Sequence, residues 1–322
     1  MKKHLVVGVD FGGTRIKIAL VDARGHIRHR TGIDVRRSWP KETLLKVLAG
    51  TIEEFLSCHA VSRKDLLGIG IGFPGLVDYP RGWVQHLVNV RGFRHVPAAS
   101  LLRKKLKLPV FIDNDVNLMA LGEATYGAAR GFSQVVCITL GTGVGGGIIL
   151  NGELYRGASF SAGEIGHVPV SRGGPLCACG NRGCFEAYVG NRTIVRKAKR
   201  RIRAGERSIV RRLVDGKLDR ITPEILSRAA RKGDRLSLSI WKEAGEWIGV
   251  ALAGIVNVHN PERIVIGGGV ADAGEFLFRP IRQSLRRHAL AWPLSHLSVV
   301  RAKLGNDAGM IGASVLVRRS LP

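Results

Sequence analysis

The chain has 322 residues, a formal net charge of +25 and a hydrophobic content of 45%. One hydrophobic core rarely organises a chain of this length, so two lobes are expected, and the apolar content argues against disorder. The longest apolar runs are shorter than the ~18 residues of a membrane-spanning helix, and Asp10 interrupts the N-terminal apolar run before signal-peptide length. We therefore expect a soluble cytoplasmic protein without a membrane partner.

The excess of basic residues has two interpretations. A polyanionic partner is one, and nucleic acid, acidic lipid and polyphosphate all qualify. A basic proteome or an Arg-rich solvated surface is the other. We favour the second, because charge alone indicates solubility and non-specific binding rather than a particular partner.

The N-terminal segment has the pattern of a β-hairpin with a glycine-rich tip. Residues 5–9 form an apolar strand that ends in Asp10, and residues 15–21 alternate like an antiparallel return strand. The tip contains Gly12, Gly13 and Thr14. Bare glycines let a phosphate approach backbone N–H groups, the threonine hydroxyl adds a donor, and the nearby carboxylate can hold Mg²⁺ through water. An ordinary hairpin turn explains this tip equally well when it is taken alone.

Helices and strands alternate over the next segment. Helices are expected at 40–60 and 98–106, and short strands at 67–72 and 109–112. A Pro/Gly turn at 73–78, which includes Gly75, follows the first of these strands. Strand ends of this kind commonly present ligand contacts in α/β proteins, although a plain turn is the alternative.

Four polar side chains separate the strand at 109–112 from a helix predicted over 118–126. They are Asp113, Asn114, Asp115 and Asn117. Asp and Asn are preferred helix N-caps, but one cap accounts for only one of the four. We therefore expect these polar side chains to be exposed together at the junction.

A second hairpin repeats the N-terminal pattern about 130 residues later. An apolar strand at 134–140 leads to a Gly/Thr tip, and residues 148–150 return before a turn at Asn151. The tip contains Gly141, Thr142 and Gly143. Because two independent tips agree, the pattern indicates an internal repeat that grips a polyphosphate from both sides.

The stretch 161–186 is glycine-rich and is not expected to form regular helix or sheet. A run of this composition buries little apolar surface, so we expect a metal to fix its shape. The predicted ligands are His167, Cys177, Cys179 and Cys184. Five cysteines, three of them within eight residues, fit a metal cluster better than a disulfide framework. Cys58 and Cys137 lie in apolar sequence and are expected to be buried thiols.

Helices and strands alternate again over the remaining segment. Helices are expected at 189–202, 222–232, 236–258, 276–288 and 307–318, and strands at 263–266 and 297–301. The helix at 189–202 is amphipathic and basic, but it lacks interleaved aromatic residues, so a solvated face is favoured over a nucleic-acid or membrane contact. Gly267, Gly268 and Gly269 follow the strand at 263–266. They allow a flat ligand such as adenine to lie against the backbone, with a tight turn as the alternative.

With these motifs in place, the chain closely resembles the ROK family of sugar kinases, within the actin-like ATPase superfamily. The resemblance covers nearly the whole length. Its motifs are residues 10–14, 73–78, 114–117, 140–143, 163–167, 177–186 and 267–269. Each motif alone is weak, and the combination of His167 with three cysteines is the most specific.

The resemblance implies an α/β fold with two ribonuclease-H-like lobes, as in actin-like ATPases, and an interdomain cleft. The smaller N-terminal lobe would comprise residues 1–112 and 306–322. The larger C-terminal lobe would comprise residues 113–305 and include the zinc-bound loop 161–186.

The implied activity is that of a glucokinase: phosphorylation of glucose at its 6-hydroxyl with MgATP, as in glycolysis. Asp115 is the implied general base, and zinc has a structural role. The implied sugar contacts are Asn114, Glu164, His167, Glu186 and Gly75, so His167 would serve zinc with one ring nitrogen and the sugar with the other. The implied ATP and phosphate ligands are Asp10 (through Mg²⁺), Gly12, Gly13, Thr14, Gly141, Thr142, Gly143, Gly267, Gly268 and Gly269.

Several alternatives stay open. The hexose can be N-acetylglucosamine, mannose, N-acetylmannosamine, allose or fructose, and inorganic polyphosphate can replace ATP. Similar proteins act as sugar-responsive transcriptional regulators, but those carry a helix-turn-helix domain in front. Because the first hairpin begins at Leu5, we expect no room for that domain and no nucleic-acid partner. A homodimer or homotetramer is expected.

Overall fold

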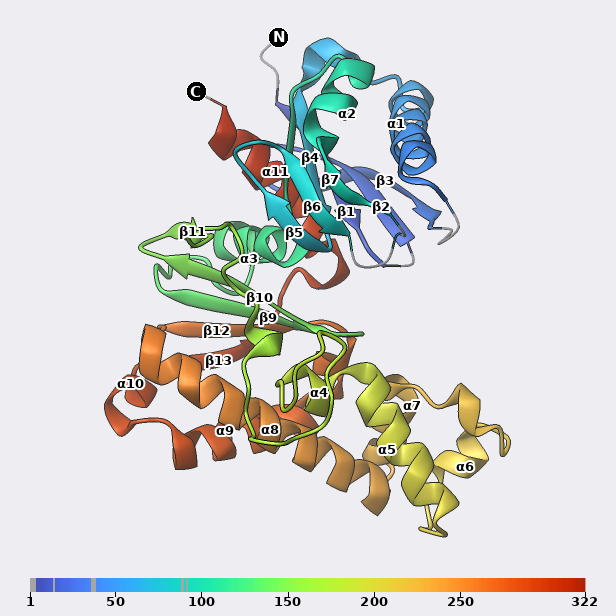
Figure 1. The fold of residues 1–322 in the computed structure, drawn as a ribbon, viewed down its shortest axis with the longest axis vertical. Coiled ribbons are helices and arrows are strands. Elements are labelled where there is room, and N and C mark those ends of the chain that lie inside the picture. The colour runs from blue at the N-terminus through green and yellow to red at the C-terminus, as the bar shows by residue number, and fades with distance from the viewer. Residues whose placement is uncertain (1–3, 14, 36–38, 88–89, 91, 322) are drawn as a thin grey trace. The chain divides into compact units, whose positions relative to one another are not determined.

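The computed structural model describes residues 4–13, 15–35, 39–87, 90 and 92–321. The chain forms two compact units, labelled by element in Figure 1. The first comprises Met1–Ser133, Gly147–Gly163 and Lys303–Pro322, and the second comprises Gln134–Gly146 and Glu164–Ala302. Among the described residues, no helix combines the length and the apolar character needed to cross a bilayer.

A mixed five-stranded sheet forms the centre of the first unit. Its strands are β1 (Leu5–Phe11), β2 (Arg15–Val21), β3 (Ile27–Asp34), β4 (Leu66–Phe73) and β8 (Val110–Asn114). The strand order is β3-β2-β1-β4-β8, with β1 antiparallel to β2 and parallel to β4. The central strands β1 and β4 are almost wholly buried, whereas the edge strand β3 is largely exposed and carries charged side chains, which discourage pairing with other chains.

Among the described residues, four helices and a small antiparallel sheet complete the first unit. They are α1 (Lys41–Cys58), α2 (Ala98–Leu106), α3 (Asp115–Tyr126), α11 (Ala308–Ser320), β5 (Gly75–Asp78), β6 (Trp83–Leu87) and β7 (Arg94–Val96), with 3-10 turns at Arg63–Asp65 and Gly305–Asp307. Leu44, Leu48 and Ile52 of α1 are fully buried and share one core with the strands. This is the apolar face expected for the helix predicted at 40–60.

Helices α3 and α11 pack at unusually short range. A Cβ atom at Gly312 would lie 1.6 Å from the carbonyl oxygen of Leu118, and one at Gly122 would lie 2.7 Å from that of Ala308. Only glycine allows the two backbones to approach this closely. Residues 113–133, 147–163 and 303–305 were predicted to belong to the C-terminal lobe, whereas all three segments belong to the first compact unit.

A second five-stranded sheet follows. Its strands are β9 (Val135–Leu140), β10 (Val144–Leu150), β11 (Glu153–Tyr155), β12 (Arg263–Gly267) and β13 (Ser298–Arg301), in the order β11-β10-β9-β12-β13. Both sheets thus place their strands in the order third, second, first, fourth, fifth, counted along the chain. The internal repeat inferred from two glycine-rich tips therefore extends to the whole sheet, and the predicted α/β fold with two ribonuclease-H-like units is confirmed.

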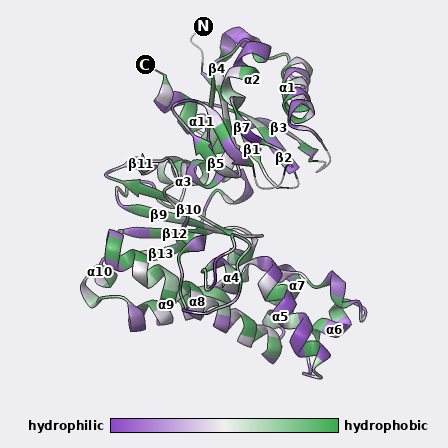
Figure 2. Ribbon diagram, viewed as in Figure 1, coloured by the Kyte–Doolittle hydropathy of each residue, from purple (hydrophilic) through white to green (hydrophobic). Residues whose placement is uncertain are grey.

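Helices supply most of the second unit. They are α4 (Glu186–Val189), α5 (Asn191–Arg203), α6 (Val210–Leu213), α7 (Pro223–Arg231), α8 (Arg235–His259), α9 (Glu275–His288) and α10 (Ala291–Ser295), with 3-10 turns at Ile165–His167, Leu218–Arg220 and Gly269–Ala273. Thr222 caps α7, and its hydroxyl accepts the N–H of Ile225 at 3.4 Å. In this unit the strands are mainly hydrophobic, whereas hydrophilic and hydrophobic residues alternate along α5 (Figure 2).

Three local expectations were wrong. The turn predicted at 73–78 ends in β5, and the sequence analysis missed the sheet β5-β6-β7 because its strands are short and mixed in polarity. The edge strand β3 was also missed, because its exposed charged residues give no apolar alternation. Cys58 is exposed, since its apolar neighbours Phe55 and Leu56 turn to the buried face of α1. Cys137 is buried, as expected.

Candidate active site and metal centre

The tip of the first hairpin is a tight turn with a charged pair beside it. The N–H of Gly12 donates to the carbonyl oxygen of Arg15 at 3.0 Å, and a Cβ atom at Gly12 would lie 2.7 Å from that oxygen. Asp10 is partly buried near the end of β1, and its Oδ2 accepts Lys17 Nζ at 3.0 Å. Lys17 lies on the return strand β2 and was not among the predicted site residues. Thr14 lies outside the described residues.

The tip of the second hairpin is held from outside the hairpin. Gly141 N–H donates to the carbonyl oxygen of Gly143 at 2.9 Å, and Asn191 N–H donates to the carbonyl oxygen of Gly141, also at 2.9 Å. Glu186 Oε2 accepts the N–H of Val144 at 2.9 Å. A Cβ atom at Gly143 would lie 2.4 Å from that carboxylate oxygen, so the tip and Glu186 fit only with glycine there. Thr142 is exposed.

The triple glycine after β12 lies against the end of β9. Gly268 has φ +84°, and a Cβ atom there would lie 2.3 Å from the carbonyl oxygen of Leu140. Both the conformation and the close approach require glycine at this position. At Gly269, by contrast, no heavy atom lies within 4 Å of a built Cβ position, which leaves space beside the backbone for a ligand.

The start of α3 is built from hydrogen-bonded polar side chains. Asn114 caps the helix, and its Oδ1 accepts the N–H groups of Val116 at 2.8 Å and Asn117 at 3.2 Å. Its Nδ2 donates to the carbonyl oxygen of Gly75 at 3.1 Å, and Gly75 has φ +114°, a region that favours glycine. Asp115 is the first helical residue, and its Oδ1 accepts the N–H of Val116 at 3.0 Å.

The expectation that all four polar residues at this junction are exposed together was wrong. Asp113 and Asn117 are each 2% exposed, and Asn117 Nδ2 donates to Asp113 Oδ1 at 2.9 Å. Burial of the Asp113 carboxylate is tolerated because one oxygen accepts Asn117 Nδ2 and the other pairs with Arg156, whereas Asn117 Oδ1 is buried without a hydrogen-bond partner among the described residues. Only Asn114 and Asp115 remain partly accessible.

The four predicted metal ligands come together in the second unit. One ligand atom from each of His167, Cys177, Cys179 and Cys184 lies within 4.8 Å of the others. His167 Nδ1 lies 3.7 Å from Cys177 Sγ, and Cys179 Sγ lies 3.7 Å from Cys184 Sγ. Ligand atoms ~2.3 Å from a tetrahedral zinc lie ~3.7 Å apart. The set therefore fits a tetrahedral zinc site by both chemistry and spacing.

The protonation of the three thiols differs. Burial and the neighbouring Cys179 and Cys177 raise the pKa of Cys184 to about 12. Burial also raises the pKa of Cys177, whereas a backbone hydrogen bond from Asn181 lowers that of the exposed Cys179. A buried thiol with a raised pKa stays protonated at neutral pH unless a cation stabilises the thiolate.

The other predicted sugar ligands of this loop surround the cysteine cluster. His167 directs Nδ1 to the cluster and Nε2 toward Glu164 Oε2, 3.8 Å away. Both side chains are more than a third exposed. Glu186 Oε1 lies 3.9 Å from Cys177 Sγ, while its Oε2 holds the second tip. Glu186 therefore links the cysteine cluster to the Gly141–Gly143 tip, which the sequence did not indicate.

A basic groove runs along α5. It has a volume of about 760 Å³, and its lining includes Ile221, Thr222 and Pro223. The basic residues that line it are Arg192, Arg196, Lys199, Arg200 and Arg203. The opposite face of α5 is apolar, as predicted, with Ile194, Ala198 and Ile202 buried. The N-terminal residue of α5, Asn191, lines the groove and also bonds Gly141 of the second tip.

The repeated sheet order and the glycine-rich tips define a protein with the actin-like ATPase fold. The model of the ROK family matches residues 6–320, and the chain belongs to this family. It is 39% identical to a glucokinase of Halalkalibacterium halodurans, over 99% of this chain and 96% of that protein.

Two further likenesses bear on function. A crystal structure of a ROK family glucokinase from Streptomyces griseus, in complex with glucose and AMPPNP, has a TM-score of 0.86 and 36% identity, and covers 98% of this chain and 100% of that one. A xylose repressor of Caldicellulosiruptor bescii is 31% identical over 97% of this chain and 77% of that protein. The family thus contains both kinases and regulators.

Proposed function

We propose that this chain is a glucokinase that transfers the terminal phosphoryl group of MgATP to the 6-hydroxyl of glucose. The observation that carries the proposal is the Asn114-Asp115 pair at the start of α3, in a chain 36% identical to a glucokinase crystallised with glucose and AMPPNP. The near-complete coverage of glucokinases by this chain supports the same conclusion.

The carboxylate of Asp115 is the proposed general base. It lies in the first turn of α3, where the helix dipole favours a negative charge, and the N–H of Val116 fixes one of its oxygens. Phosphoryl transfer passes through a loose transition state, so the base orients the attacking hydroxyl and accepts its proton late. Asn114, already oriented as the helix cap, is the proposed sugar contact beside it, with Gly75 supporting its amide.

The two Gly/Thr tips are the proposed phosphate ligands. In the first unit, Gly12, Gly13 and Thr14 would supply backbone and hydroxyl donors, and Asp10 would hold Mg²⁺ through water. In the second unit, Gly141, Thr142 and Gly143 have the corresponding role. The open space at Gly269 suits the adenine, with Gly267 and Gly268 beside it.

Zinc is proposed to be structural and to be held by His167, Cys177, Cys179 and Cys184. Four protein ligands leave no open position, so bound zinc supplies rigidity rather than bond-making chemistry. The residues that act on the sugar are then Glu164, Glu186 and the Nε2 atom of His167. The geometry supports this double use, because His167 turns Nδ1 to the cysteines and Nε2 to Glu164.

A panel of acceptors and donors tests the proposed function. The purified protein is assayed with glucose, mannose, N-acetylglucosamine, N-acetylmannosamine, allose and fructose, each with MgATP. We expect the highest kcat/KM for glucose and a product phosphorylated at position 6 by NMR. A higher kcat/KM for another sugar would reassign the substrate, and no turnover of any sugar by metal-replete protein would reject the kinase.

Polyphosphate is the second candidate donor, and the basic groove along α5 favours it. Five basic side chains line this groove, and it begins at Asn191 beside the second tip. The assay is therefore repeated with polyphosphate in place of ATP. Arg196→Glu should lower kcat/KM for polyphosphate much more than for ATP if polyphosphate is the donor. Equal effects on the two donors would reject this alternative.

A sugar-responsive regulator is the second candidate class. The likeness to a xylose repressor over 97% of this chain favours it. Because the charge of +25 produces non-specific DNA affinity at low salt, a DNA shift must be titrated with salt. Sequence-specific binding that survives physiological salt would support regulation. We also propose a homodimer or homotetramer, which light scattering after gel filtration would measure.

A further inference from the structure

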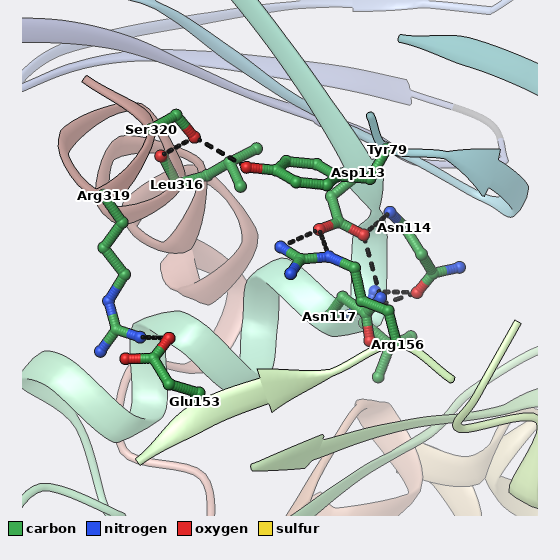
Figure 3. A network of polar contacts seen from close by, with 10 residues as sticks. Tyr79, Asp113, Asn114, Asn117, Glu153, Arg156, Leu316, Arg319 and Ser320 are labelled. Carbon is green, nitrogen blue, oxygen red and sulfur yellow. Dashed lines mark hydrogen bonds and ion pairs between the residues drawn. The ribbon is translucent and has the colours of Figure 1, made fainter. Parts of the chain in front are cut away.

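Asp113 is a buried carboxylate for which the proposed chemistry has no use. It is 2% exposed and lies one residue before the end of β8. Its Oδ1 accepts the N–H of Asn114 at 2.7 Å and Nδ2 of Asn117 at 2.9 Å. Its Oδ2 accepts Nε of Arg156 at 2.8 Å and lies 2.7 Å from Nη2 of the same side chain. Both carboxylate oxygens are therefore occupied by protein donors, as Figure 3 shows.

Arg156 is itself held in place. It follows β11, and its guanidinium carbon lies 4.0 Å from the centroid of the Tyr79 ring. The Tyr79 hydroxyl is 3.1 Å from the Ser320 hydroxyl on α11. The Arg156 side chain is only 20% exposed. A guanidinium fixed by a carboxylate and an aromatic face loses little further freedom when it acts as a support.

This chain of contacts ends at the residues on either side of the proposed base. Asp113 fixes the backbone of Asn114 and the side chain of Asn117, and Asn114 in turn caps the first turn that contains Asp115. We propose that Arg156 and Asp113 are positioning residues, whose buried ion pair sets the direction in which α3 presents Asp115. This inference rests on the proposed function and adds to it an ion pair that lies outside the kinase motifs.

The physical reason is the sensitivity of in-line transfer to geometry. A misplacement of about 1 Å at the reacting group costs ~100-fold in rate. Without Arg156 on Oδ2, the side chain at position 113 is free to turn, which weakens the two bonds of its Oδ1, to the Asn114 N–H and to Asn117 Nδ2, and the first turn of α3 gains freedom. The rate constant kcat should therefore fall. The KM for MgATP should not change, because the two Gly/Thr tips proposed to bind its phosphates are untouched.

The test avoids leaving one buried charge unpaired. The double variant Asp113→Asn/Arg156→Met removes both charges at once, whereas either single change risks unfolding. We expect kcat to fall 10- to 100-fold with the KM for MgATP within twofold of wild type. The matched control is Arg319→Met, which breaks the surface pair of Arg319 with Glu153 on the same β11 segment, and should leave kcat within twofold. A double variant that folds and keeps its kcat would overturn the inference.

Two further readouts separate positioning from mere stability. When Asp115→Asn is already present, adding the double change should lower the residual rate by less than twofold, because the ion pair acts through Asp115. Losses that multiply would contradict this. Hydrogen exchange of the peptide spanning 110–120 should be faster in the double variant and unchanged in Arg319→Met. If the wild type phosphorylates no sugar, the proposed function fails, and hydrogen exchange alone still decides whether the ion pair orders this turn.

Discussion

The start of α3 and the loop 161–186 both carry residues proposed to contact the hexose, yet they are held by different means. Around α3, protein groups bond one another: Asn114 caps the helix, and the Asp113–Arg156 pair anchors it. In the loop, the corresponding role falls to His167 and three cysteines, whose thiols form only weak hydrogen bonds. On the proposed assignment, protein groups alone hold the first region, whereas a bound zinc holds the second.

This difference shows why the two regions should respond differently to change. Loss of one side chain near α3 leaves a network with other members in place. Loss of one ligand in the loop should remove the proposed zinc, and with it the fixed positions of Glu164, His167 and Glu186. Glu186 carries the effect further, because it also holds the second phosphate tip.

The largest effect is expected at Asp115. Asp115→Asn keeps the size of the side chain but removes the base, so kcat should fall ~1,000-fold. Glucose affinity should stay within about threefold, because the cap and the network around α3 remain. Coupled turnover assays and calorimetric glucose titration measure the two quantities. A variant that keeps more than a few per cent of the wild-type rate would show that Asp115 is not the base.

A smaller effect is expected where the loop touches the second tip. Gly143→Ala places a Cβ atom 2.4 Å from Glu186 Oε2, so the hydrogen bond to Val144 must break. Loss of a hydrogen bond to a charged group should raise the KM values for MgATP and for glucose by about tenfold.

Gly141→Ala is the matched control for this link. No heavy atom lies within 4 Å of its built Cβ position, so the change meets only a bound phosphate. It should raise the KM for MgATP and leave glucose affinity unaltered. If Gly141→Ala and Gly143→Ala alter glucose affinity equally, Glu186 does not connect the tip to the sugar loop.

The smallest effect is expected at the helix cap. Asn114→Ala removes the oxygen that accepts Val116 and Asn117 N–H, at a cost of ~1 kcal/mol in unfolding free energy. Asn114→Ser retains a capping oxygen and should recover most of that stability, while losing the amide donor to Gly75. Urea unfolding of both variants measures the difference. Equal stability of the two would mean that the cap contributes nothing.

Sequence patterns predicted the parts that depend on local chemistry. The glycine tips, the strands with apolar runs and the cluster of His167 with three cysteines are all visible in short windows of residues. Patterns also predicted the repeat of the hairpins, although not its extension to whole five-stranded sheets, because β3 and β11 are short or polar.

Contacts between distant segments could not be predicted from the sequence. Asp113 and Arg156 are 43 residues apart and their pairing leaves no periodic signal. The same holds for Glu186 and Val144, at 42 residues. Asp113 and Asn117 were expected to be exposed because polar residues usually are, and their burial is explained by their bond to each other and by the pair of Asp113 with Arg156.

The central claim is that the sugar loop depends on a metal whereas the start of α3 does not. The direct measurement is zinc content and glucose affinity on the same samples: wild type, wild type stripped by chelator, stripped protein reloaded with Zn²⁺, and Cys179→Ser. We predict one zinc per chain in wild type, joint loss of zinc and glucose affinity in the stripped protein and in Cys179→Ser, and joint recovery on reloading. Hydrogen exchange over residues 110–120 should stay the same throughout. Metal-free protein that binds glucose as tightly as the zinc-loaded protein would contradict the account.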